Sequence, residues 1–546
     1  MKVCLLYEDR EWAKDERYYD PASIIQDLGL RALFLAAAKR LVYENGIVKS
    51  VDKEDTYLLE TLKSVMMIPL TTREEIEFRQ EIISDCLQHE DLIRELYQVS
   101  CDLINEQAKL GRGPKEKAKQ NNPVIKLVTD IKELELFCNS LSHIKKLFAD
   151  ASGALASKGF NTFAKDISEA FSDEREEYIR RNLADVSFYT ERIDQIDERR
   201  SEVIRPRIVM ECGLEDGLKF SSLKLEEISS QNTRFLRPGS TRYKLQQFID
   251  SRIPDSFSTV QDPRINDQAH TLEFMVVSYM TEDIREMMEE FAGFFEKLKF
   301  QTAFYLSVVQ LAAQMERFRI KWCFPKVCDR RDLEFTDLKE FIMGLEQRAK
   351  VIGNTCSIKN KDLLIVTGAN QGGKSTFFRS IGIAQVMMQA GLMVTAESFS
   401  SGIFPRIFVH FTRREDSAMN SGRLDEELNR MSKIVDHIGD GSLLLLNESF
   451  ATTTEKEGSL IAYDIIRALN EAGVRILTVT HLLSFAKRVS EESKNMPESG
   501  TEFLSAERKE DGTRTYHMIQ HEPELTSFGL DLYEEIVERQ LRKNNK

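Results

Sequence analysis

Residues 363 to 376, which read LLIVTGANQGGKST, constrain the fold of this chain more than any other stretch of its sequence. An apolar run leads to Gly368, and after four further residues come Gly, Lys and Ser at positions 373 to 375. The apolar run predicts a buried strand, and residues 377 to 390 predict a helix. A strand, a glycine-rich loop and a helix with this spacing are typical of a phosphate-binding P-loop.

The residue types in this loop suit a nucleoside triphosphate with Mg²⁺. Glycines let backbone N–H groups turn toward phosphate oxygens, and the following helix presents its positive dipole end to the same anion. We expect Lys374 to reach the β- and γ-phosphates and Ser375 to ligate Mg²⁺. An ordinary glycine-rich turn is the alternative, and the flanking strand and helix argue against it. The predicted nucleotide-binding residues of the loop are Gly368, Ala369, Asn370, Gln371, Gly372, Gly373, Lys374, Ser375 and Thr376.

Length and composition indicate a globular protein of several domains. The chain has 546 residues, of which 42% are hydrophobic and 30% are charged. It contains no apolar run long enough for a membrane span, and its start turns polar too early for a signal peptide. Eight cysteines without a CxxC pair indicate reduced thiols in the cytoplasm. The net charge of −14 argues against indiscriminate coating of nucleic acid but not against a local basic patch.

The first half of the chain is predicted to be mainly helical. Residues 1 to 60 combine strand and helix patterns, and Thr71 or Thr72 is expected to cap a helix together with the glutamates that follow. From there the pattern is helical to about residue 204, and a second long helical stretch covers 269 to 320.

Between these helical stretches lies a segment of different character, residues 205 to 262. Short apolar runs separated by Gly, Ser and Pro predict strands, so two helical arms would flank a small, partly β tip. Heptad spacing at 173 to 203 fits an exposed arm, and an amphipathic helix packed on a core explains it nearly as well. Basic residues gather at 107 to 122 and 234 to 244. Both groups are candidates for DNA contact, and a solvated loop is the alternative for the first.

From Phe324 onward, apolar strands alternate with helices, which predicts a largely parallel sheet with helices on both faces. A terminal hairpin is expected from Phe503 to Ile519, with its turn at Asp511 and Gly512. The strands expected before this hairpin lie at residues 333–335, 363–367, 407–411, 443–446 and 474–480.

Polar residues follow two of these strands, at the carboxyl edge where an open α/β sheet binds ligands. Glu448 is expected to polarise the water that attacks the γ-phosphate. Asn447 stands where an aspartate usually supports Mg²⁺, and its uncharged amide oxygen can still accept a hydrogen bond from metal-bound water. ATP binding is therefore a safer expectation than fast hydrolysis. His481 is placed to sense the γ-phosphate.

A further turn precedes the helix predicted from Arg423. Ser421 and Gly422 form this turn, and the N-terminus of the helix is able to meet phosphate. Taken alone, the pattern is also that of an ordinary turn and helix cap.

Together these residues resemble the ATPase core of the MutS mismatch-repair family. Its P-loop, Gly–x–Asn–x–Gly–Gly–Lys–Ser–Thr, is matched from Gly368 to Thr376. NESFATTTEKEG resembles its Walker B region, LTVTHLLSFA its switch-histidine segment, and TSFGL its late Ser–aromatic–Gly element. PLTTREEIEFRQ resembles the start of its helical core.

The resemblance implies a multidomain fold of long helices and an α/β P-loop NTPase domain. It predicts an N-terminal segment at 1–60, a helical core and lever at 61–330 with a reduced clamp at about 205–262, and an ATPase domain with dimerisation elements at 331–546. The family's mismatch-reading and connector domains are expected to be missing. The Phe–x–Glu triplet at 294–296 falls within a predicted long helix, where packing explains it, so conventional mismatch reading is not expected.

The resemblance implies a homodimeric, cytoplasmic ATPase of DNA repair or recombination that uses ATP and Mg²⁺. Two composite nucleotide sites would each be completed by the other subunit's signature loop, where this chain has Ser421, Gly422 and Arg423. ATP binding would clamp the subunits and move the levers, which couples nucleotide state to the grip on double-stranded, branched or irregular DNA.

Two other functional interpretations are open at this point. One is a nucleotide-gated dimeric scaffold with little hydrolysis and a protein partner instead of DNA. The other, an ABC-type chromosome ATPase of the SMC sort, is disfavoured because both arms precede the P-loop.

Overall fold

The computed structural model describes the chain in segments, which fall into two compact units. The first unit comprises Met1–Val3, Glu95–Ala154 and Thr162–Lys299, and the second comprises Cys4–Arg94, Leu155–Asn161 and Phe300–Lys546. No helix in the described segments is long and apolar enough to cross a membrane. The described residues are 2–12, 18–37, 43–44, 47–48, 53–110, 123–187, 207–215, 219–229, 291, 293–347, 351–369, 371–412, 423–495, 500–509 and 513–523.

Several sequence predictions lie outside these described residues. They include Asn370 of the P-loop, the Ser421–Gly422 and Asp511–Gly512 turns, and the late Ser–aromatic–Gly element at 526–530. The basic residues at 111–122 and 234–244, the predicted arm from 188 to 204, the clamp from 230 to 262 and the helical stretch from 269 to 290 also lie outside them.

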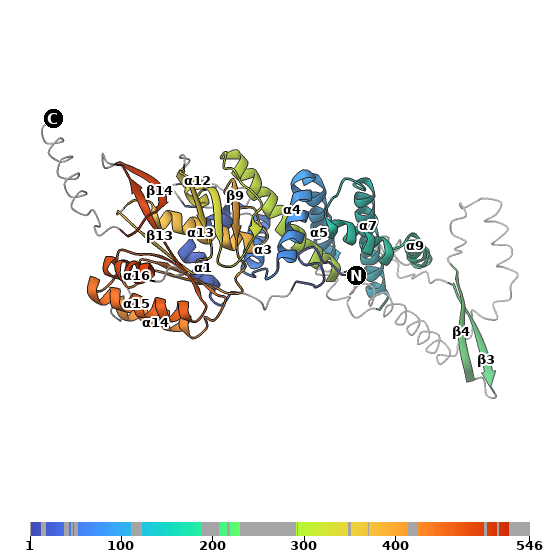
Figure 1. Cartoon of the computed structure of the whole chain (residues 1–546). Coiled ribbons are helices and arrows are strands. Elements are labelled where there is room, and N and C mark those ends of the chain that lie inside the picture. Colours follow the sequence, from blue (N-terminus) through green and yellow to red (C-terminus); the bar gives the residue numbers. More distant parts are fainter. Residues whose placement is uncertain are drawn as a thin grey trace. The chain divides into compact units, whose positions relative to one another are not determined.

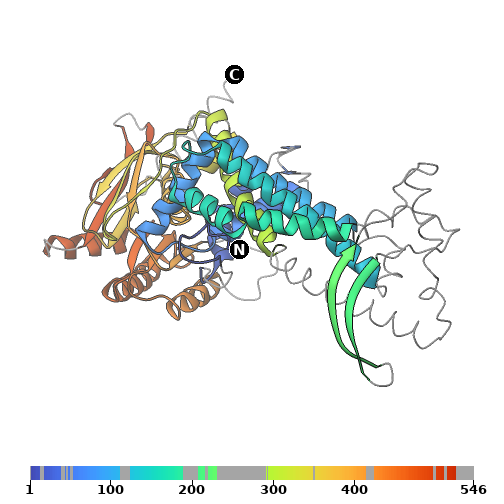
Figure 2. The same cartoon turned by 90° about the vertical axis from the view of Figure 1, so that its right-hand side faces the viewer.

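The described part of the first unit contains helices and one β-hairpin (Figures 1 and 2). Its described helical segments include α7 (Pro123–Asp150), α9 (Asp173–Ser187), most of α5 (Glu90–Leu110) and α8 (Lys158–Ala170), and residues 293–299. Strands β3 (Arg207–Glu215) and β4 (Lys219–Ser229) pair antiparallel, as the sequence pattern predicts for this part of the chain.

Aromatic side chains form the core of the first unit. Phe137 contacts Phe291 and Phe295, with 5.7 Å between ring centroids in each pair. Phe294 is 1% exposed and stacks on Phe163. The Phe–x–Glu triplet at 294–296 therefore contributes a core side chain, which confirms that packing explains this phenylalanine.

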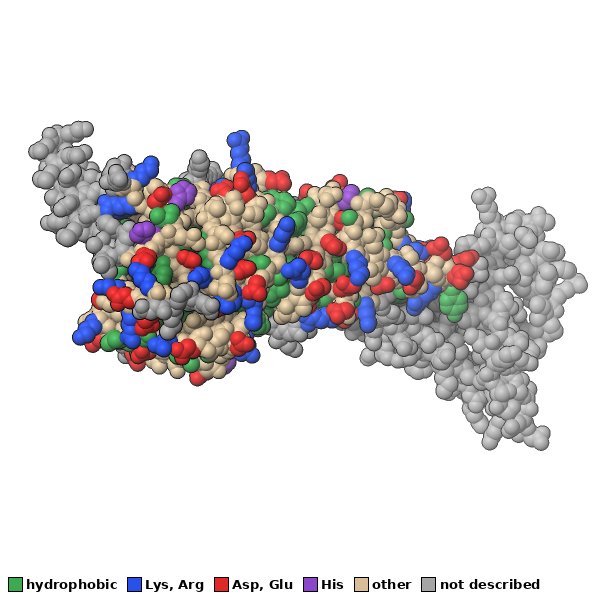
Figure 3. Space-filling model, in the orientation of Figure 1, with side chains coloured by type: hydrophobic (Ala, Val, Ile, Leu, Met, Phe, Trp, Pro, Cys, Tyr) green, Lys and Arg blue, Asp and Glu red, His purple; other side chains and the backbone are tan. Residues whose placement is uncertain are grey.

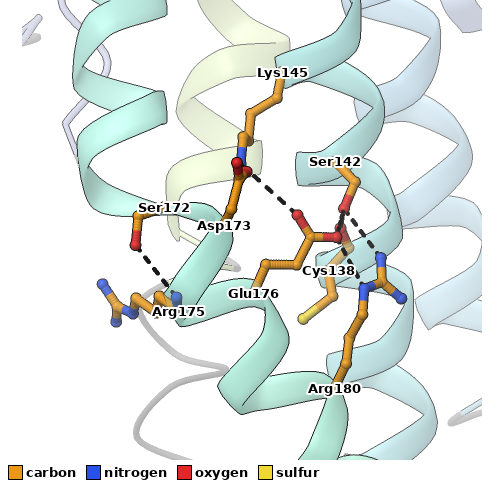
Figure 4. Close-up of polar contacts among 8 residues, drawn as sticks. All are labelled: Cys138, Ser142, Lys145, Ser172, Asp173, Arg175, Glu176 and Arg180. Carbon is orange, nitrogen blue, oxygen red and sulfur yellow. Dashed lines mark hydrogen bonds and ion pairs between the residues drawn. The ribbon is translucent and has the colours of Figure 1, made fainter.

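Polar contacts join α7 to the beginning of α9 (Figure 4). The Glu176 carboxylate accepts hydrogen bonds from the Ser142 hydroxyl at 2.6 Å and from Arg180 Nε at 2.9 Å. Lys145 Nζ donates to Asp173 at 2.6 Å. Burial raises the pKa of Glu176, but these donors and Lys145 more than offset burial, so the pKa lies below its ordinary value.

The second unit contains a six-stranded sheet with the P-loop strand near its centre. The strand order is β10-β11-β12-β8-β13-β14, and all neighbours are parallel except β13 and β14. The predicted largely parallel sheet is thus confirmed, and the terminal hairpin joins it through β13. The strands are β8 (Leu363–Thr367), β10 (Ile407–Phe411), β11 (Leu443–Asn447), β12 (Arg475–Val479), β13 (Thr501–Arg508) and β14 (Arg514–Gln520).

Helices cover both faces of this sheet (Figure 1). On one face, α14 (Arg423–Val435), α15 (Glu455–Glu471) and α16 (Leu483–Asn495) bury a core with Leu444, Leu446 and Ile476 of the strands. On the other lies α13 (Lys374–Gln389), where Gly382 allows close approach to Leu445. Because successive side chains point to opposite faces and both faces are covered, strands β8, β10 and β12 are near-continuous apolar runs.

A second, four-stranded sheet lies in the same unit, in the order β5-β9-β6-β7. The strand predicted at 333–335 is found here as β6 and does not belong to the P-loop sheet. The other three are short and rich in polar residues, so their sequences carry little strand signal. The strands are β5 (Lys326–Val327), β6 (Leu333–Leu338), β7 (Asn354–Ile358) and β9 (Ser398–Ser401), and helix α12 (Phe341–Gln347) follows β6.

The N-terminal segment packs against the P-loop sheet. Helix α1 (Pro21–Leu28) begins with Asp20 as its cap and contacts β10 and α13. Asp27 accepts hydrogen bonds from Arg430 Nη2 at 3.1 Å and from the Phe411 backbone N–H at 3.4 Å. The edge strand β10 is therefore covered by a helix, which protects it from pairing with other chains.

The remaining described elements of the N-terminal region are short strands and helices that lead to α4. Thr72 caps α4 by accepting from the Glu75 N–H at 3.2 Å, and the Thr71 N–H donates to the Glu75 carboxylate, which confirms the predicted capping. These elements are α2 (Arg31–Ala36), β1 (Tyr43–Glu44), β2 (Ile47–Val48), α3 (Lys53–Met66) and α4 (Arg73–Gln88).

Candidate functional site

A pocket of about 430 Å³ opens at the P-loop in the second unit. Five separate parts of the sequence supply its lining: the P-loop with the beginning of α13, the end of β11, the end of β12, the segment from β6 to β7, and β14. Polar residues that the structure brings together here are Glu340, Asn354, Gln371, Lys374, Ser375, Thr376, Ser380, Glu448, His481 and Tyr516.

The P-loop takes its shape from glycines and from contact with β13. Gly368 has φ +112°, and a side chain there would lie 2.8 Å from the Ala506 backbone nitrogen. A Cβ atom on Gly372 would lie 2.9 Å from the Ala506 side chain. Gly373 has φ +87° and precedes the first residue of α13. Only glycine fits such conformations and approaches without strain.

Lys374 is buried beneath the loop. Its Nζ donates to the carbonyls of Gly368 at 2.9 Å and Ala369 at 2.8 Å. Burial lowers the pKa of Lys374 to about 8, and the nearby Glu448 opposes this change. A phosphate group at this position would favour the charged lysine, because it adds a negative charge where solvent is scarce.

Glu448 and His481 form a pair at the carboxyl ends of β11 and β12. His481 Nε2 lies 2.9 Å from Glu448 Oε1, and this hydrogen bond lowers the pKa of Glu448 although burial raises it. Glu448 has φ +56°, a left-handed conformation that is uncommon for a residue with a side chain. Strained backbone of this kind clusters at functional sites.

Asn447 ends β11 with a side-chain oxygen that is buried. Within the described segments this Oδ1 atom has no hydrogen-bond partner. A buried acceptor left in this state fits a water molecule bound to Mg²⁺, and the Ser375 hydroxyl in the nearby pocket is a second oxygen donor. No group of three or more His, Cys, Asp or Glu residues in the described parts could hold a metal alone. Mg²⁺ would therefore depend largely on phosphate oxygens for its remaining ligands.

Tyr516 is a pocket residue that the sequence analysis missed. It lies on β14 with φ +63°, is 45% exposed, and its ring is 3.3 Å from where a Gly373 Cβ would be. The side-chain amide of Asn354 bonds to the Tyr516 carbonyl and the Met518 N–H, and so ties β7 to this strand.

Apolar side chains from the four-stranded-sheet region line the same pocket. They give one side of the pocket an apolar wall, against which a nucleobase could pack. The Asp511–Gly512 turn predicts the hairpin that carries Tyr516, but local pattern does not reveal that the hairpin borders the P-loop. These side chains are Leu338, Met343, Val351 and Ile352.

Arg423 is the first residue of α14, and the turn before it lies outside the described residues. On the face drawn in Figure 3, basic and acidic side chains of the described residues are interspersed, and no large single-sign patch is visible among them.

Comparison with known proteins matches two regions of the chain to family models. One, described as MutS domain V, covers residues 364–538, and the other, described as the MutS2 N-terminal domain, covers residues 71–195.

Individual proteins show the same similarity. The DNA mismatch repair protein MutS of Microcystis aeruginosa is 28% identical over 210 residues, which are 37% of this chain and 23% of that protein. Endonuclease MutS2 of Latilactobacillus sakei is 32% identical over 147 residues, 27% of this chain and 19% of its own length. Endonuclease MutS2 of Carboxydothermus hydrogenoformans is 25% identical over 360 residues, 62% of this chain and 45% of its own. The chain thus spans less than half the length of these relatives.

Proposed function

Because this chain belongs to the MutS family, we propose that it is a homodimeric ATPase that couples ATP binding and hydrolysis to its grip on DNA. The convergence of the P-loop with the Glu448–His481 pair in one pocket is the observation that carries this proposal. Five segments that are separate in sequence supply complementary groups, which a chance glycine-rich turn does not explain.

Each pocket residue has a distinct role in this proposal. Lys374 and the loop N–H groups bind the β- and γ-phosphates, and Tyr516 with its apolar neighbours holds the base. Ser375 and Asn447 would hold Mg²⁺, which when bound neutralises charge that develops on the phosphates. Glu448 orients the attacking water and accepts its proton, and His481 fixes the Glu448 carboxylate through their 2.9 Å hydrogen bond.

Asn447 sets the expected rate of turnover. A neutral amide supports metal-bound water by hydrogen bonding but contributes no charge to it. We therefore expect slow hydrolysis, with binding of ATP as the main event that changes the state of the protein.

The proposed nucleic-acid substrate is double-stranded DNA that is branched or otherwise irregular. The match to MutS domain V and the likeness to a DNA mismatch repair protein support a role in DNA repair. In the proposed dimer, the 421–423 loop of one subunit completes the nucleotide site of the other, and the helical levers transmit closure to a clamp at about 205–262. The protein would work in the cytoplasm without conventional mismatch reading.

A second candidate is a nucleotide-gated scaffold that binds a protein instead of DNA. The net charge of −14 and the neutral Asn447 favour this alternative. DNA affinity separates the two functions, because phosphate contacts release counterions and weaken steeply with salt.

The deciding experiment measures steady-state ATP turnover with and without branched DNA, beside a Glu448→Gln variant. Glutamine keeps the volume of the side chain but cannot accept the proton from water. We expect DNA to change the wild-type rate and the variant to lower kcat by about 100-fold or more while ATP still binds. ATP-driven dimerisation without turnover would establish the scaffold instead.

A further inference from the structure

A buried carboxylate lies behind the catalytic pair, on a helix that does not itself line the pocket. Glu427 of α14 is 6% exposed. Its Oε1 accepts from the Phe450 backbone N–H at 2.7 Å, and its Oε2 accepts from the Thr452 hydroxyl at 2.7 Å. The Thr412 hydroxyl lies 3.4 Å from the same Oε1 atom. Charge-assisted hydrogen bonds of this kind are the strong ones in proteins.

These bonds hold a loop whose backbone is under strain. Glu448 has φ +56° and Phe450 has φ +64°, although neither residue is glycine. Such conformations persist only when their surroundings over-determine them. Glu427 fixes the Phe450 N–H, and the Thr412 hydroxyl donates to the Glu448 carbonyl at 2.7 Å. Both left-handed residues are therefore held from outside the loop.

A second contact joins the same three segments. His410 is fully buried in β10, with Nδ1 2.7 Å from the Ser449 hydroxyl and Nε2 3.2 Å from the Glu427 backbone oxygen. The residue between the two left-handed ones is thus also tied to α14. These contacts tie the loop that carries Glu448 to α14. The loop can move independently of α14 only if the contacts break.

We propose that Glu427 is a positioning residue for ATP hydrolysis, which sets the Glu448 loop according to the placement of α14. Helix α14 begins at Arg423, the last of the three residues that the proposed function gives to the partner's nucleotide. Engagement of one site would in this way be transmitted to the catalytic carboxylate of the other. This inference rests on the proposed ATPase function.

The test compares Glu427→Ala and Glu427→Gln with Glu426→Ala, a matched change at the neighbouring glutamate. Glu426 makes no hydrogen bond with any described residue. Thermal unfolding, ATP affinity from titration with a fluorescent ATP analogue, and single-turnover hydrolysis with Mg²⁺ are measured for each protein.

We expect Glu427→Ala to lower the hydrolysis rate by about 10- to 100-fold, because a misplaced catalytic group costs that much, while ATP affinity changes by less than about threefold. Glu427→Gln should recover most of the rate, since its oxygen still accepts from the Phe450 N–H and its amide can donate to Thr452. Glu426→Ala should hydrolyse ATP at the wild-type rate.

If Glu427→Ala does not fold, Thr452→Val tests the inference instead. This substitution removes the hydroxyl that donates to Glu427 and leaves the carboxylate in place. We expect a rate loss of about three- to tenfold with unchanged ATP affinity. Two results would overturn this inference while leaving the proposed function intact. One is a wild-type hydrolysis rate in the folded Glu427 and Thr452 variants, and the other is a loss of rate that equals their loss of ATP affinity. Absence of hydrolysis by the wild-type protein would remove the proposed function and this inference with it.

Discussion

At the scale of single residues, the site depends on charges that are held out of water. Lys374 donates to two loop carbonyls while burial lowers its pKa to about 8, and Glu448 keeps its carboxylate ionised through His481. A nucleotide that enters this pocket meets a lysine whose charge state is set by the protein. The affinity for ATP should therefore depend on pH near and above pH 8, where the phosphates of ATP are already fully ionised and only Lys374 changes its charge.

The first prediction concerns that pH dependence. Above about pH 8 the free protein holds Lys374 increasingly neutral, and binding of phosphate must restore the proton. Affinity for Mg²⁺–ATP should consequently fall by up to about tenfold per pH unit above that point. Isothermal titration calorimetry at pH 7 and pH 9, in buffers of different ionisation enthalpy, should show proton uptake at the higher pH. An equal affinity for Mg²⁺–ATP at both pH values would contradict this prediction.

The second prediction concerns Asn447. Asn447→Asp places a negative charge beside the expected Mg²⁺ position with almost no change in volume. The variant should need less Mg²⁺ for half-maximal activity and should hydrolyse ATP faster, by about tenfold. A Mg²⁺ titration of ATP turnover measures both quantities, with Asn470→Asp on α15 as the control. An unchanged Mg²⁺ requirement would mean that this side chain does not face the metal.

At the scale of elements, β13 shapes the P-loop as much as the loop's own sequence does. Gly372 would meet the Ala506 side chain at 2.9 Å and the Ala369 carbonyl at 3.0 Å if it carried a Cβ atom. Gly368 approaches the backbone of the same strand residue. Glycine is therefore required at these two loop positions because β13, more than a hundred residues later in the sequence, lies against them.

The third prediction tests this contact. Gly372→Ala should destabilise the protein by about 1–3 kcal/mol through overpacking, and Ala506→Gly should cost about 0.5–1 kcal/mol by itself. Combined, the two changes should cost less than their sum, because the second removes one of the clashes made by the first. Urea unfolding of the four proteins measures this coupling. Strict additivity would show that the loop and β13 do not touch.

Local pattern was sufficient for the P-loop, the parallel strands of its sheet, the terminal hairpin and the cap of α4. Each of these depends on residues near one another in sequence. Local pattern did not show that β13 pairs with β8, that β6 belongs to a second sheet, or that Tyr516 reaches the pocket. These features depend on contacts between distant segments, for which periodicity carries no information. The contacts of Glu427 were missed for the same reason, because Phe450 and Thr452 follow the next strand in the sequence.

At the scale of the whole molecule, Cys4–Arg94 and Phe300–Lys546 belong to one unit, and most of the helical region lies between them in the sequence. The Asp27–Arg430 ion pair is part of this connection, and its aspartate side chain is 3% exposed. The described residues between Cys4 and Ala37 thus take part in the unit that contains the P-loop.

The fourth prediction concerns this ion pair. Asp27→Ala removes the carboxylate with which Arg430 pairs in the wild-type protein. Loss of this buried pair should lower the free energy of unfolding of the second unit by about 3 kcal/mol. Asp20→Ala, at the cap of the same helix, should cost only about 1 kcal/mol. Thermal unfolding followed with and without ATP compares the two. Equal costs would mean that the buried pair contributes no more than a helix cap.

The arrangement of the second unit also governs when the P-loop pocket can form during synthesis. Asp27 cannot pair with Arg430 until the ribosome has made the 403 residues that separate them. The P-loop strand β8 likewise pairs with β12 and β13, which are synthesised after it. At about 5–20 residues per second, this delay lasts about 20–80 s. Meanwhile the inserted helices have time to fold, and the apolar N-terminal segment stays without its sheet. A cell that makes this protein must keep that segment from aggregating until translation is nearly complete.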